Sequence, residues 1–297
     1  HQKPGPASDH LRFQSFNVDL AGESLKAGDM DMYFFSLKTE AAQKLRGAPG
    51  LTIYQAPATS ISLLLNPAPA PAGELNPFSI KEVRFALQYA VNRQFIAQEI
   101  YKGLAEPMTA HVGPFDYDYL TVYDQLKQES IAYDPDLARQ MIAEPMAKAG
   151  ATLKDGKWNY NGRPIQLKFI IRVEDERRDV GDLIRAQLEN LGFSVAPNYQ
   201  SFASAVLTVY GSDPQLFQWN LYTEGWGRGS AERYDFSTIN SMAAPWLGNM
   251  PGWQESGFWQ YQNDKLDELG KRIFQGRFKD QAERDQLYRD MTQLAMN

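Results

Sequence analysis

Apolar and polar residues alternate along this chain with two periods, one typical of strands and one typical of helices. Period-two patterns predict strands, and apolar residues three or four positions apart predict helices. The predicted strands are residues 11–16, 29–34, 51–54, 61–65, 158–160, 165–172, 193–195 and a run that begins at 216. The predicted helices are residues 19–27, 38–45, 79–91, 92–103, 134–150, 177–191, 201–210, 264–274 and 280–294. Strands interleaved with helices indicate an α/β fold with a mixed sheet.

Local signals sharpen several of these boundaries. Ser79 with Glu82 three residues later has the pattern of a capping box at a helix start. Asp134 followed by Pro135 is a second helix start, and Pro145 is expected to kink or split that helix. The pairs Asp155-Gly156 and Asn161-Gly162 are typical of tight turns, so residues 158–160 form a short hairpin strand. The strand at 193–195 is expected to run parallel to the strand at 165–172, through a right-handed helical crossover.

One stretch differs in composition from its surroundings. Residues 66–77 are rich in proline, alanine and glycine, which predicts a linker and a boundary between two lobes.

Composition narrows the class of protein. The chain has 297 residues and a formal net charge of −6, without any basic run, which argues against a nucleic-acid partner. It has no cysteine, which excludes disulfides and thiolate metal sites, and its three histidines are too scattered for a zinc motif. No apolar run is long enough to span a membrane. No signal peptide precedes His1, so we expect either a cytoplasmic protein or a piece of a processed one.

The most informative stretch is residues 216–235, LFQWNLYTEGWGRGSAERYD. Its first half predicts a strand, and Gly225, Gly227 and Gly229 predict a loop after it. Flat rings beside charges of both signs suit a binding cleft. The candidate binding residues are Tyr222 and Glu224 at the mouth of the strand and Trp226, Arg228, Glu232 and Arg233 in the loop. The other interpretation is a surface loop whose tryptophan covers a nearby core.

Enzymatic motifs are largely missing from the sequence. Glu174, Asp175 and Glu176 could act as an acid and a base, but acidic residues at a helix start also favour the positive end of its dipole, and we prefer that explanation. There is no Gly-x-Ser-x-Gly elbow, no phosphate loop and no dinucleotide-binding glycine motif.

The order of several segments resembles the solute-binding proteins of ABC importers, in the large family 5 that binds peptides, nickel and oligosaccharides. The most specific match is NPFSIKEVRFALQYAVNR at residues 76–93, preceded by LLNP at 64–67. Further matches are AGDMD at 27–31, IYKGLAEP at 100–107, residues 134–150, Gly225-Trp226, and residues 261–269. The resemblance runs over nearly the whole chain, and members of this family are considerably longer.

The resemblance implies a periplasmic-binding-protein-like lobe, a mixed sheet flanked by helices, with part of a second lobe. Residues 1–65 would be the C-terminal portion of lobe I, 66–77 the linker and 78–297 lobe II. It implies a periplasmic or extracellular protein, without cofactor or catalytic residues, that captures a peptide-like or other small polar solute in a cleft between the lobes. The partners would be that ligand and the permease of the ABC transporter, and the membrane would be reached only through the permease or an anchor missing from this sequence.

One position departs from the family pattern. Peptide-binding members are expected to carry an aspartate three residues after the cleft tryptophan, to hold the amino terminus of the ligand, and here that position is Gly229. Two other functions remain open from the sequence, a carboxylate-dependent hydrolase acting on carbohydrate through residues such as Glu174, Asp175 or Glu224, and a cell-envelope scaffold that reuses the lobe.

Overall fold

The computed structural model describes residues 8–55, 59–114, 116, 118–129, 131–227, 244, 246 and 261–296. The chain divides into two compact units, His1–Tyr54 and Gln55–Asn297. The boundary between them lies before the strand at residues 59–65, which the sequence analysis grouped with the first part of the chain. The assignment of residues to lobes I and II stays a prediction.

The first unit is built on two short helices, α1 (Val18–Ala27) and α2 (Thr39–Leu45), which confirm the helices predicted at 19–27 and 38–45. The strands predicted at 11–16, 29–34 and 51–54 are wrong, because none of these segments pairs with another. Their alternating apolar residues stay exposed, and Phe13 and Phe34 contact one another edge to face. An alternating pattern does not become a strand without a neighbour to share its hydrogen bonds.

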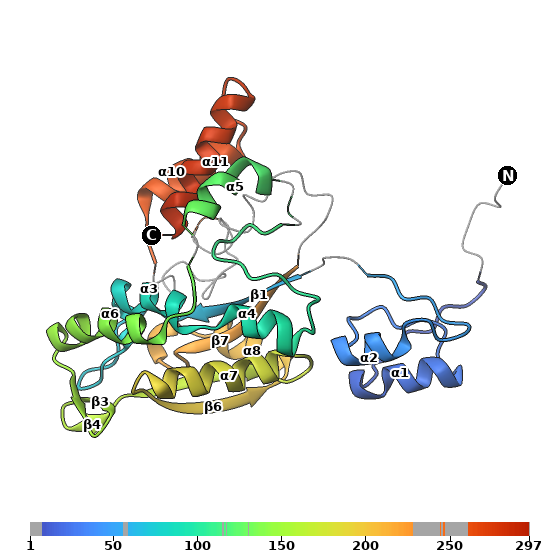
Figure 1. Ribbon diagram of the computed structural model, residues 1–297, viewed down its shortest axis with the longest axis horizontal. Coiled ribbons are helices and arrows are strands. Elements are labelled where there is room, and N and C mark those ends of the chain that lie inside the picture. Colours follow the sequence, from blue (N-terminus) through green and yellow to red (C-terminus); the bar gives the residue numbers. More distant parts are fainter. Residues whose placement is uncertain are drawn as a thin grey trace. The chain divides into compact units, whose positions relative to one another are not determined.

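The second unit contains a four-stranded sheet in the order β1-β7-β5-β6 (Figure 1). Strands β5, β6 and β7 are parallel, and β1 pairs with β7 antiparallel at one edge. This confirms the predicted mixed sheet and the parallel return after the strand at 165–172. The strands are β1 (Thr59–Leu65), β5 (Gln166–Arg172), β6 (Ser194–Gln200) and β7 (Leu221–Gly227). A separate small sheet consists of β2 (Thr152–Lys154), β3 (Lys157–Tyr160) and β4 (Arg163–Pro164).

Helices cover both faces of the four-stranded sheet. The helical elements of this unit are η1 (Pro77–Ser79), α3 (Lys81–Ala90), α4 (Arg93–Phe95), η2 (Ile96–Ile100), α5 (Tyr119–Gln128), α6 (Pro135–Lys148), α7 (Arg177–Asn190), α8 (Phe202–Val209), η3 (Pro214–Leu216), α10 (Asp264–Phe274) and α11 (Gln281–Met296). No helix in the described part of the chain is both long and apolar enough to cross a membrane.

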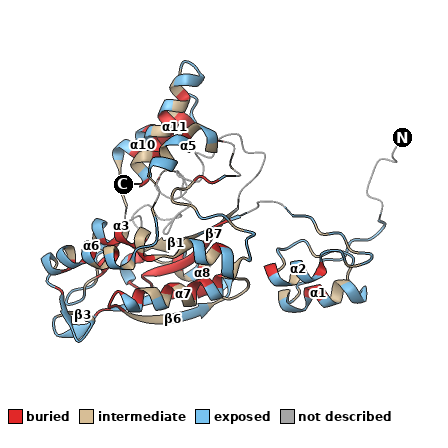
Figure 2. Ribbon diagram, in the orientation of Figure 1, coloured by how far each residue is buried: buried red, intermediate tan, exposed pale blue. Residues whose placement is uncertain are grey.

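The two faces of the sheet bury different sets of side chains, because successive residues of a strand point to opposite sides. Leu167, Phe169 and Ile171 of β5 join the larger core, to which α3, α6 and α7 contribute. Ile170 of β5 and Tyr222 of β7 join a smaller core with residues of α8. Figure 2 shows buried segments on the sheet between these helices. The face of the sheet that packs against α8 is called the α8 face below.

A third core lies among α5, α10 and α11, and α5 is a helix that the sequence analysis did not predict. Its centre contains an ion pair between Arg284 of α11 and Asp118, both almost fully buried. Arg284 also lies over the ring of Tyr288, 5.0 Å from guanidinium carbon to ring centroid. Asp118 directly precedes α5, so this pair joins the start of that helix to α11.

The segment 66–77, expected to be a linker, is held against the sheet by three buried asparagines. Asn66 Nδ2 donates to the carbonyls of Pro214 and Trp219, each at 3.0 Å. Asn76 Nδ2 donates to the carbonyls of Asn66 and Ala68, each at 2.8 Å. Asn220 Nδ2 donates to Asn76 Oδ1 at 3.1 Å. These three residues, the asparagine cluster, lie beside the amino ends of β5 and β7, since Asn220 directly precedes β7 and also receives a bond from Lys168 N of β5.

Several predicted helix and turn signals are confirmed, and the predicted cap at Ser79 is wrong. Asp134 caps α6 through a bond from Leu137 N, and α6 continues through Pro145 without being split. Asp155 and Asn161 adopt the positive φ angles that their turns require. Ser79 does not cap a helix; α3 begins after Ile80, and Ser79 Oγ donates instead to the carbonyl of Asn76.

Candidate functional site

Strand β7 brings three of the predicted binding residues onto one face. Tyr222, Glu224 and Trp226 are two residues apart in a strand, so their side chains share the α8 face. The loop predicted around Gly225 and Gly227 is wrong, since both glycines lie within β7 and pair with Ile61 and Thr59 of β1. The neighbouring strand keeps this segment extended where glycine content alone predicted a turn.

Trp226 is half-buried, and its position on the sheet is fixed by a hydrogen bond. The indole Nε1 donates to Ser62 Oγ of β1 at 2.9 Å. Ser62 lies opposite Glu224 in the register of the two strands, so the bond turns the indole toward β1. A tryptophan held in this way presents a rigid, partly exposed ring at the sheet edge.

Glu224 is a buried carboxylate whose hydrogen-bond partners are uncharged. Its exposed fraction is 4%, the Tyr210 hydroxyl donates to Oε2, and Gly225 N donates to Oε1 at 2.7 Å. Burial raises the pKa of Glu224, and these two hydrogen bonds, together with the charges of Arg172 and Arg177, oppose that shift only in part. Burial and the charge of Glu224 likewise raise the pKa of Tyr210.

Two arginines lie near the carboxyl end of β5, and each is paired with a carboxylate. Arg172, the last residue of β5, donates from Nε to Glu174 at 2.8 Å, and Arg177 at the start of α7 donates from Nε to Asp175 at 2.8 Å. Burial alone would raise the pKa of Asp175, but the hydrogen bonds and charge of Arg177 hold it below its usual value. Asp175 also accepts from Arg177 N at 3.0 Å, which is the structural role that the sequence favoured for this acidic run.

Gly225 is required by the close approach of Arg177. A Cβ added at Gly225 would lie 2.7 Å from Arg177 Nη1 and 3.3 Å from Ile61 Cδ1. Arg177 therefore packs on the backbone of β7 on the face opposite to Tyr222, Glu224 and Trp226. No side chain larger than hydrogen fits there without displacing the guanidinium.

Two hydroxyls on the α8 face are buried. Tyr222 is fully buried, and Arg172 of the neighbouring strand is close enough to act as a hydrogen-bond donor to its Oη. Burial and the charge of Glu224 raise the pKa of Tyr222, and the hydrogen bond and charge of Arg172 act in the opposite direction. The second hydroxyl is Ser60 Oγ, which lies on β1 directly opposite Trp226 and has no hydrogen-bond partner among the described residues. Buried polar atoms are nearly always hydrogen-bonded, so Ser60 Oγ marks a position where a further polar group could bind.

The remaining predicted site residues, Arg228, Glu232 and Arg233, lie outside the described residues, as does Gly229. Sequence reasoning missed Arg172, Tyr210 and Ser60. Arg172 could have been found from its place as the last residue of a parallel strand, where ligands of α/β proteins commonly bind. Nothing in the local sequence connects Tyr210 or Ser60 to Glu224, because each contact depends on strand order.

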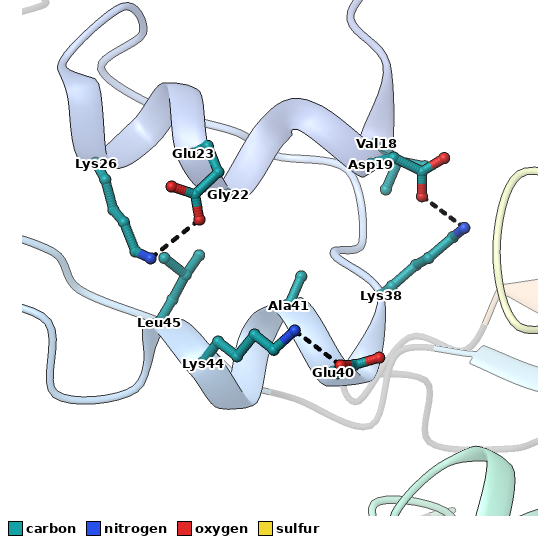
Figure 3. Close-up of a pocket in the computed structure, with 10 residues that line it drawn as sticks. All are labelled: Val18, Asp19, Gly22, Glu23, Lys26, Lys38, Glu40, Ala41, Lys44 and Leu45. Atoms are coloured by element: carbon teal, nitrogen blue, oxygen red, sulfur yellow. Dashed lines mark hydrogen bonds and ion pairs between the residues drawn. The ribbon is translucent and has the colours of Figure 1, made fainter.

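A hollow of about 210 Å³ lies in the first unit between α1 and α2 (Figure 3). It is lined by charged side chains that pair across or along the two helices. The pairs are Lys26–Glu23 at 3.0 Å, Lys38–Asp19 at 2.6 Å and Lys44–Glu40 at 2.8 Å. Exposed ion pairs of this kind contribute little to stability. Each lysine in these three pairs is matched by a carboxylate, so the pairs offer a ligand no net charge. Within the described ranges, no group of three acidic or histidine side chains is arranged to hold a metal ion.

Comparison with solved structures shows the fold. The chain is similar to a periplasmic oligopeptide-binding protein of an ABC transporter from Thermotoga maritima, solved with mannohexaose, with a TM-score of 0.75 and 20% identity over 95% of this chain. It is similar to NikZ from Campylobacter jejuni in complex with Ni(L-His), with a TM-score of 0.69 and 17% identity over 96% of this chain. It is also similar to the oligopeptide-binding protein AppA from Bacillus subtilis in complex with a nonapeptide, with a TM-score of 0.62 and 20% identity over 94% of this chain.

In each case the chain spans only about half of the solved protein, namely 51%, 52% and 51% of its length. A comparison with curated protein sequences finds no match. The family model for bacterial extracellular solute-binding proteins, family 5, matches residues 2–244, which is well over half of the chain. The chain therefore belongs to the family 5 bacterial extracellular solute-binding proteins, a family of binding proteins rather than enzymes.

Proposed function

We propose that this protein is the extracytoplasmic solute-binding component of an ABC importer, and that it captures a peptide-like or other small polar solute at the carboxyl ends of β5 and β7. The observation that carries the proposal is the placement of Tyr222, Glu224 and Trp226 on one face of β7, with Trp226 toward its carboxyl end. In open α/β sheets, ligands bind outside the carboxyl ends of the strands. A half-buried ring beside buried polar groups is the composition of a small-molecule site.

Binding at this edge needs no covalent chemistry. The Trp226 ring supplies a flat wall for stacking, and the buried polar groups beside it supply hydrogen bonds strengthened by exclusion of water. Of the three carboxylates that a hydrolase could use, Glu174 and Asp175 pair with arginines, and Glu224 is buried and hydrogen-bonded by Tyr210 and Gly225 N. Arg228, Glu232 and Arg233 are proposed as further contacts from their place in the sequence directly after β7.

Family membership supports the proposed partners and location. A permease of the ABC type would receive the solute, and the protein would act in the periplasm or at the cell surface. The similar proteins from Thermotoga maritima and Helicobacter pylori are described as periplasmic, which supports this location.

Isothermal titration calorimetry tests the proposal with three solutes taken from the similar structures: trialanine as a small peptide, mannohexaose, and the nickel–histidine complex. At least one is expected to bind. Substituting Trp226→Ala should weaken that binding by about 1–3 kcal/mol, as loss of a binding hot spot does. The control is Tyr123→Ala, which removes an exposed ring on α5, and it should bind as the wild type does.

Native mass spectrometry of the protein as purified extends the test to solutes outside this panel. A co-purified small molecule, released on denaturation and retained less by Trp226→Ala, supports the proposed site. Binding that is equal in wild type and Trp226→Ala would remove β7 from the site. A protein that neither carries nor binds any solute would contradict the proposed function.

A further inference from the structure

The two edges of the four-stranded sheet differ in whether they can accept a further strand. The strand order places β6 at one edge and β1 at the other, and among the described residues neither pairs with a second neighbour. An edge strand presents a row of backbone N–H and C=O groups, with which another strand can pair unless proline, charge or a bulge blunts the edge.

The β6 edge is blunted by Pro197. Ser194 N donates to the carbonyl of Ile165, so Ser194 and every second residue after it turn their backbone groups toward β5. Pro197 is three positions further along and therefore lies on the outward side. A ladder bond there would need the N–H that proline lacks, so this edge cannot extend the sheet regularly.

The β1 edge has no such feature. Thr59–Leu65 contains no proline, glycine or charged residue, and its pairing with β7 is continuous along its whole length. The bond from Asn66 N to Asn220 O continues this ladder, so the even-numbered residues of β1 turn their backbone groups toward β7. The odd-numbered residues turn theirs outward, where no strand of the described chain pairs with them.

Two side chains at the β1 edge are also short of contacts. Ile61 is 36% exposed, although Leu63 and Leu65 on the same face pack into the larger core. On the α8 face, Ser60 is 8% exposed and its Oγ has no hydrogen-bond partner among the described residues. A further strand would cover Ile61 and bring a side chain beside Ser60.

The chemistry of the β1 edge fits a second copy of the same strand. A two-fold contact brings residues near the centre against their own copies, so charges of one sign would repel there. The chain has a formal net charge of −6, but β1 has no charged residue. Its Ser62 Oγ accepts from Trp226 Nε1 and has a hydroxyl hydrogen of its own to donate. The edge thus contains both a hydroxyl donor and, at Ser60, an acceptor.

We propose that β1 pairs antiparallel with β1 of a second copy of this chain, about a two-fold axis at Ile61, so that the sheet continues through both copies. In this register Ile61 lies opposite its own copy, and the two residues exchange both backbone hydrogen bonds. Ser60 lies opposite Ser62 of the second copy, in a pair without backbone bonds. Side chains approach most closely in such pairs, so Ser62 Oγ donates to Ser60 Oγ on each side of the axis. The inference is independent of which solute binds.

Sedimentation velocity over about 1–200 µM tests the contact, since a short strand pair buries too little surface for tight association. Wild type is expected to pass reversibly from its monomer mass of 33.6 kDa to twice that mass. Ile61→Lys places two ammonium groups opposite one another and should stay monomeric over the range. The matched control is Asn198→Lys, which adds the same charge at an exposed position of β6 and should dimerise as the wild type does.

A cross-link tests the register without relying on the Ile61→Lys variant. The chain has no cysteine, so Ile61→Cys has a single thiol, placed at the two-fold axis. Directly paired residues have Cα atoms about 5.5 Å apart, which is within reach of a disulfide. Oxidised glutathione should convert this variant to a cross-linked dimer on a non-reducing gel, while the control Asn198→Cys should give no cross-linked dimer.

Three results would overturn the proposal. The first is a wild type that stays monomeric over the whole concentration range. The second is a dimer that Ile61→Lys leaves intact, and the third is a dimer in which Ile61→Cys forms no cross-link, because the copies then meet on another surface. Solute binding is measured by calorimetry on the monomeric protein, so failure of this contact leaves the proposed function standing.

Discussion

The two ends of the four-stranded sheet both contain buried polar side chains, but they satisfy them differently. At the amino ends of β5 and β7, Asn66, Asn76 and Asn220 bond to one another and to nearby backbone carbonyls and amides. Toward the carboxyl end of β7, Glu224 makes no ion pair and is hydrogen-bonded by a phenol and a backbone N–H, and Ser60 Oγ of β1 has no partner within the described residues. Saturated polar networks hold a fold together, whereas unsatisfied ones at a strand edge are expected where a ligand completes them.

The comparison also explains why residues 66–77 do not behave as their composition suggests. A segment rich in proline and glycine has few side chains with which to bury itself. Asn66 and Asn76 compensate by supplying bonds in both directions, so that the backbone at Ala68 becomes fully buried. The amino end of the sheet is thus expected to govern stability, and the carboxyl end to govern binding.

The largest effect is expected from breaking the asparagine cluster. Asn76→Ala removes two donated and two accepted bonds, and leaves the carbonyls of Asn66 and Ala68 buried without a donor. The substitution should lower the free energy of unfolding by about 3–5 kcal/mol, measured by urea denaturation. The control is Asn198→Ala on the exposed edge strand β6, which should change stability by less than about 0.5 kcal/mol. A small effect of Asn76→Ala on the free energy of unfolding would show that the asparagine cluster does not govern stability.

An intermediate effect is expected from Gly225→Ala, which affects both stability and binding. The added Cβ meets Arg177 Nη1 at 2.7 Å, so either the guanidinium or β7 must shift. We expect a loss of about 1–3 kcal/mol of stability, typical of overpacking, and weaker solute binding because Trp226 is the next residue. Gly22→Ala provides the control, since its Cβ would meet Leu45 Cδ1 at an ordinary 3.4 Å within α1. Full retention of both properties by Gly225→Ala would show that Arg177 does not fix this part of β7.

The pH dependence of stability offers a smaller but diagnostic effect. Because the pKa of Glu224 is raised in the folded protein, protonated Glu224 favours folding; the benefit is full below the unfolded pKa of about 4.3 and is lost as pH rises to the folded pKa. Asp175 behaves in the opposite sense, since its lowered pKa stabilises the fold above its unfolded pKa and that benefit is lost in acid.

Melting temperatures of wild type and Glu224→Gln between pH 4 and 8 test this sign. The melting temperature of Glu224→Gln should rise relative to that of the wild type as pH rises. The difference between the two melting temperatures should become constant once Glu224 is fully ionised. The groups that face Glu224 are Tyr210, Tyr222 and Arg172, with Arg177 behind the strand, so none of these is to be altered in the series. A difference that shrinks with rising pH would mean that Glu224 is stabilised as the anion.

The smallest effect is expected from Trp226→Phe. The ring remains available for stacking, but the bond from Nε1 to Ser62 Oγ is lost, which should weaken solute binding by about 0.5–1.5 kcal/mol. Ser62→Ala removes the same bond from the other side and should give a similar loss in calorimetry. If Trp226→Phe is as damaging as Trp226→Ala, the indole N–H and not the ring surface makes the important contact.

Sequence patterns predicted the parts of this fold that depend on local chemistry. The helix from Asp264 to Phe274 and the turns at Asp155 and Asn161 follow from residues within a few positions of one another. The family resemblance, confirmed by the match over residues 2–244, supplied the fold class. The α8 face was predicted only in part, through Tyr222, Glu224 and Trp226.

What sequence could not supply are the consequences of strand order. That β7 lies between β1 and β5 decides that Gly225 is in a strand, that Ser60 lies opposite Trp226, and that Arg172 is beside Glu224. The strand predicted at 29–34 is wrong because its alternating residues have no neighbouring strand with which to pair. Local pattern fixes which residues share a face, and long-range pairing decides which faces meet.

The most direct test of the central claim follows the indole N–H resonance of Trp226 by nuclear magnetic resonance. The resonance is assigned by its disappearance in Trp226→Phe, and that of the buried Trp219 by its disappearance in Trp219→Phe. On saturation with the solute that binds most tightly in calorimetry, the Trp226 resonance is predicted to shift while that of Trp219, beside the asparagine cluster, stays in place. A bound solute that leaves the Trp226 resonance unmoved would contradict the assignment of binding to the carboxyl end of the sheet.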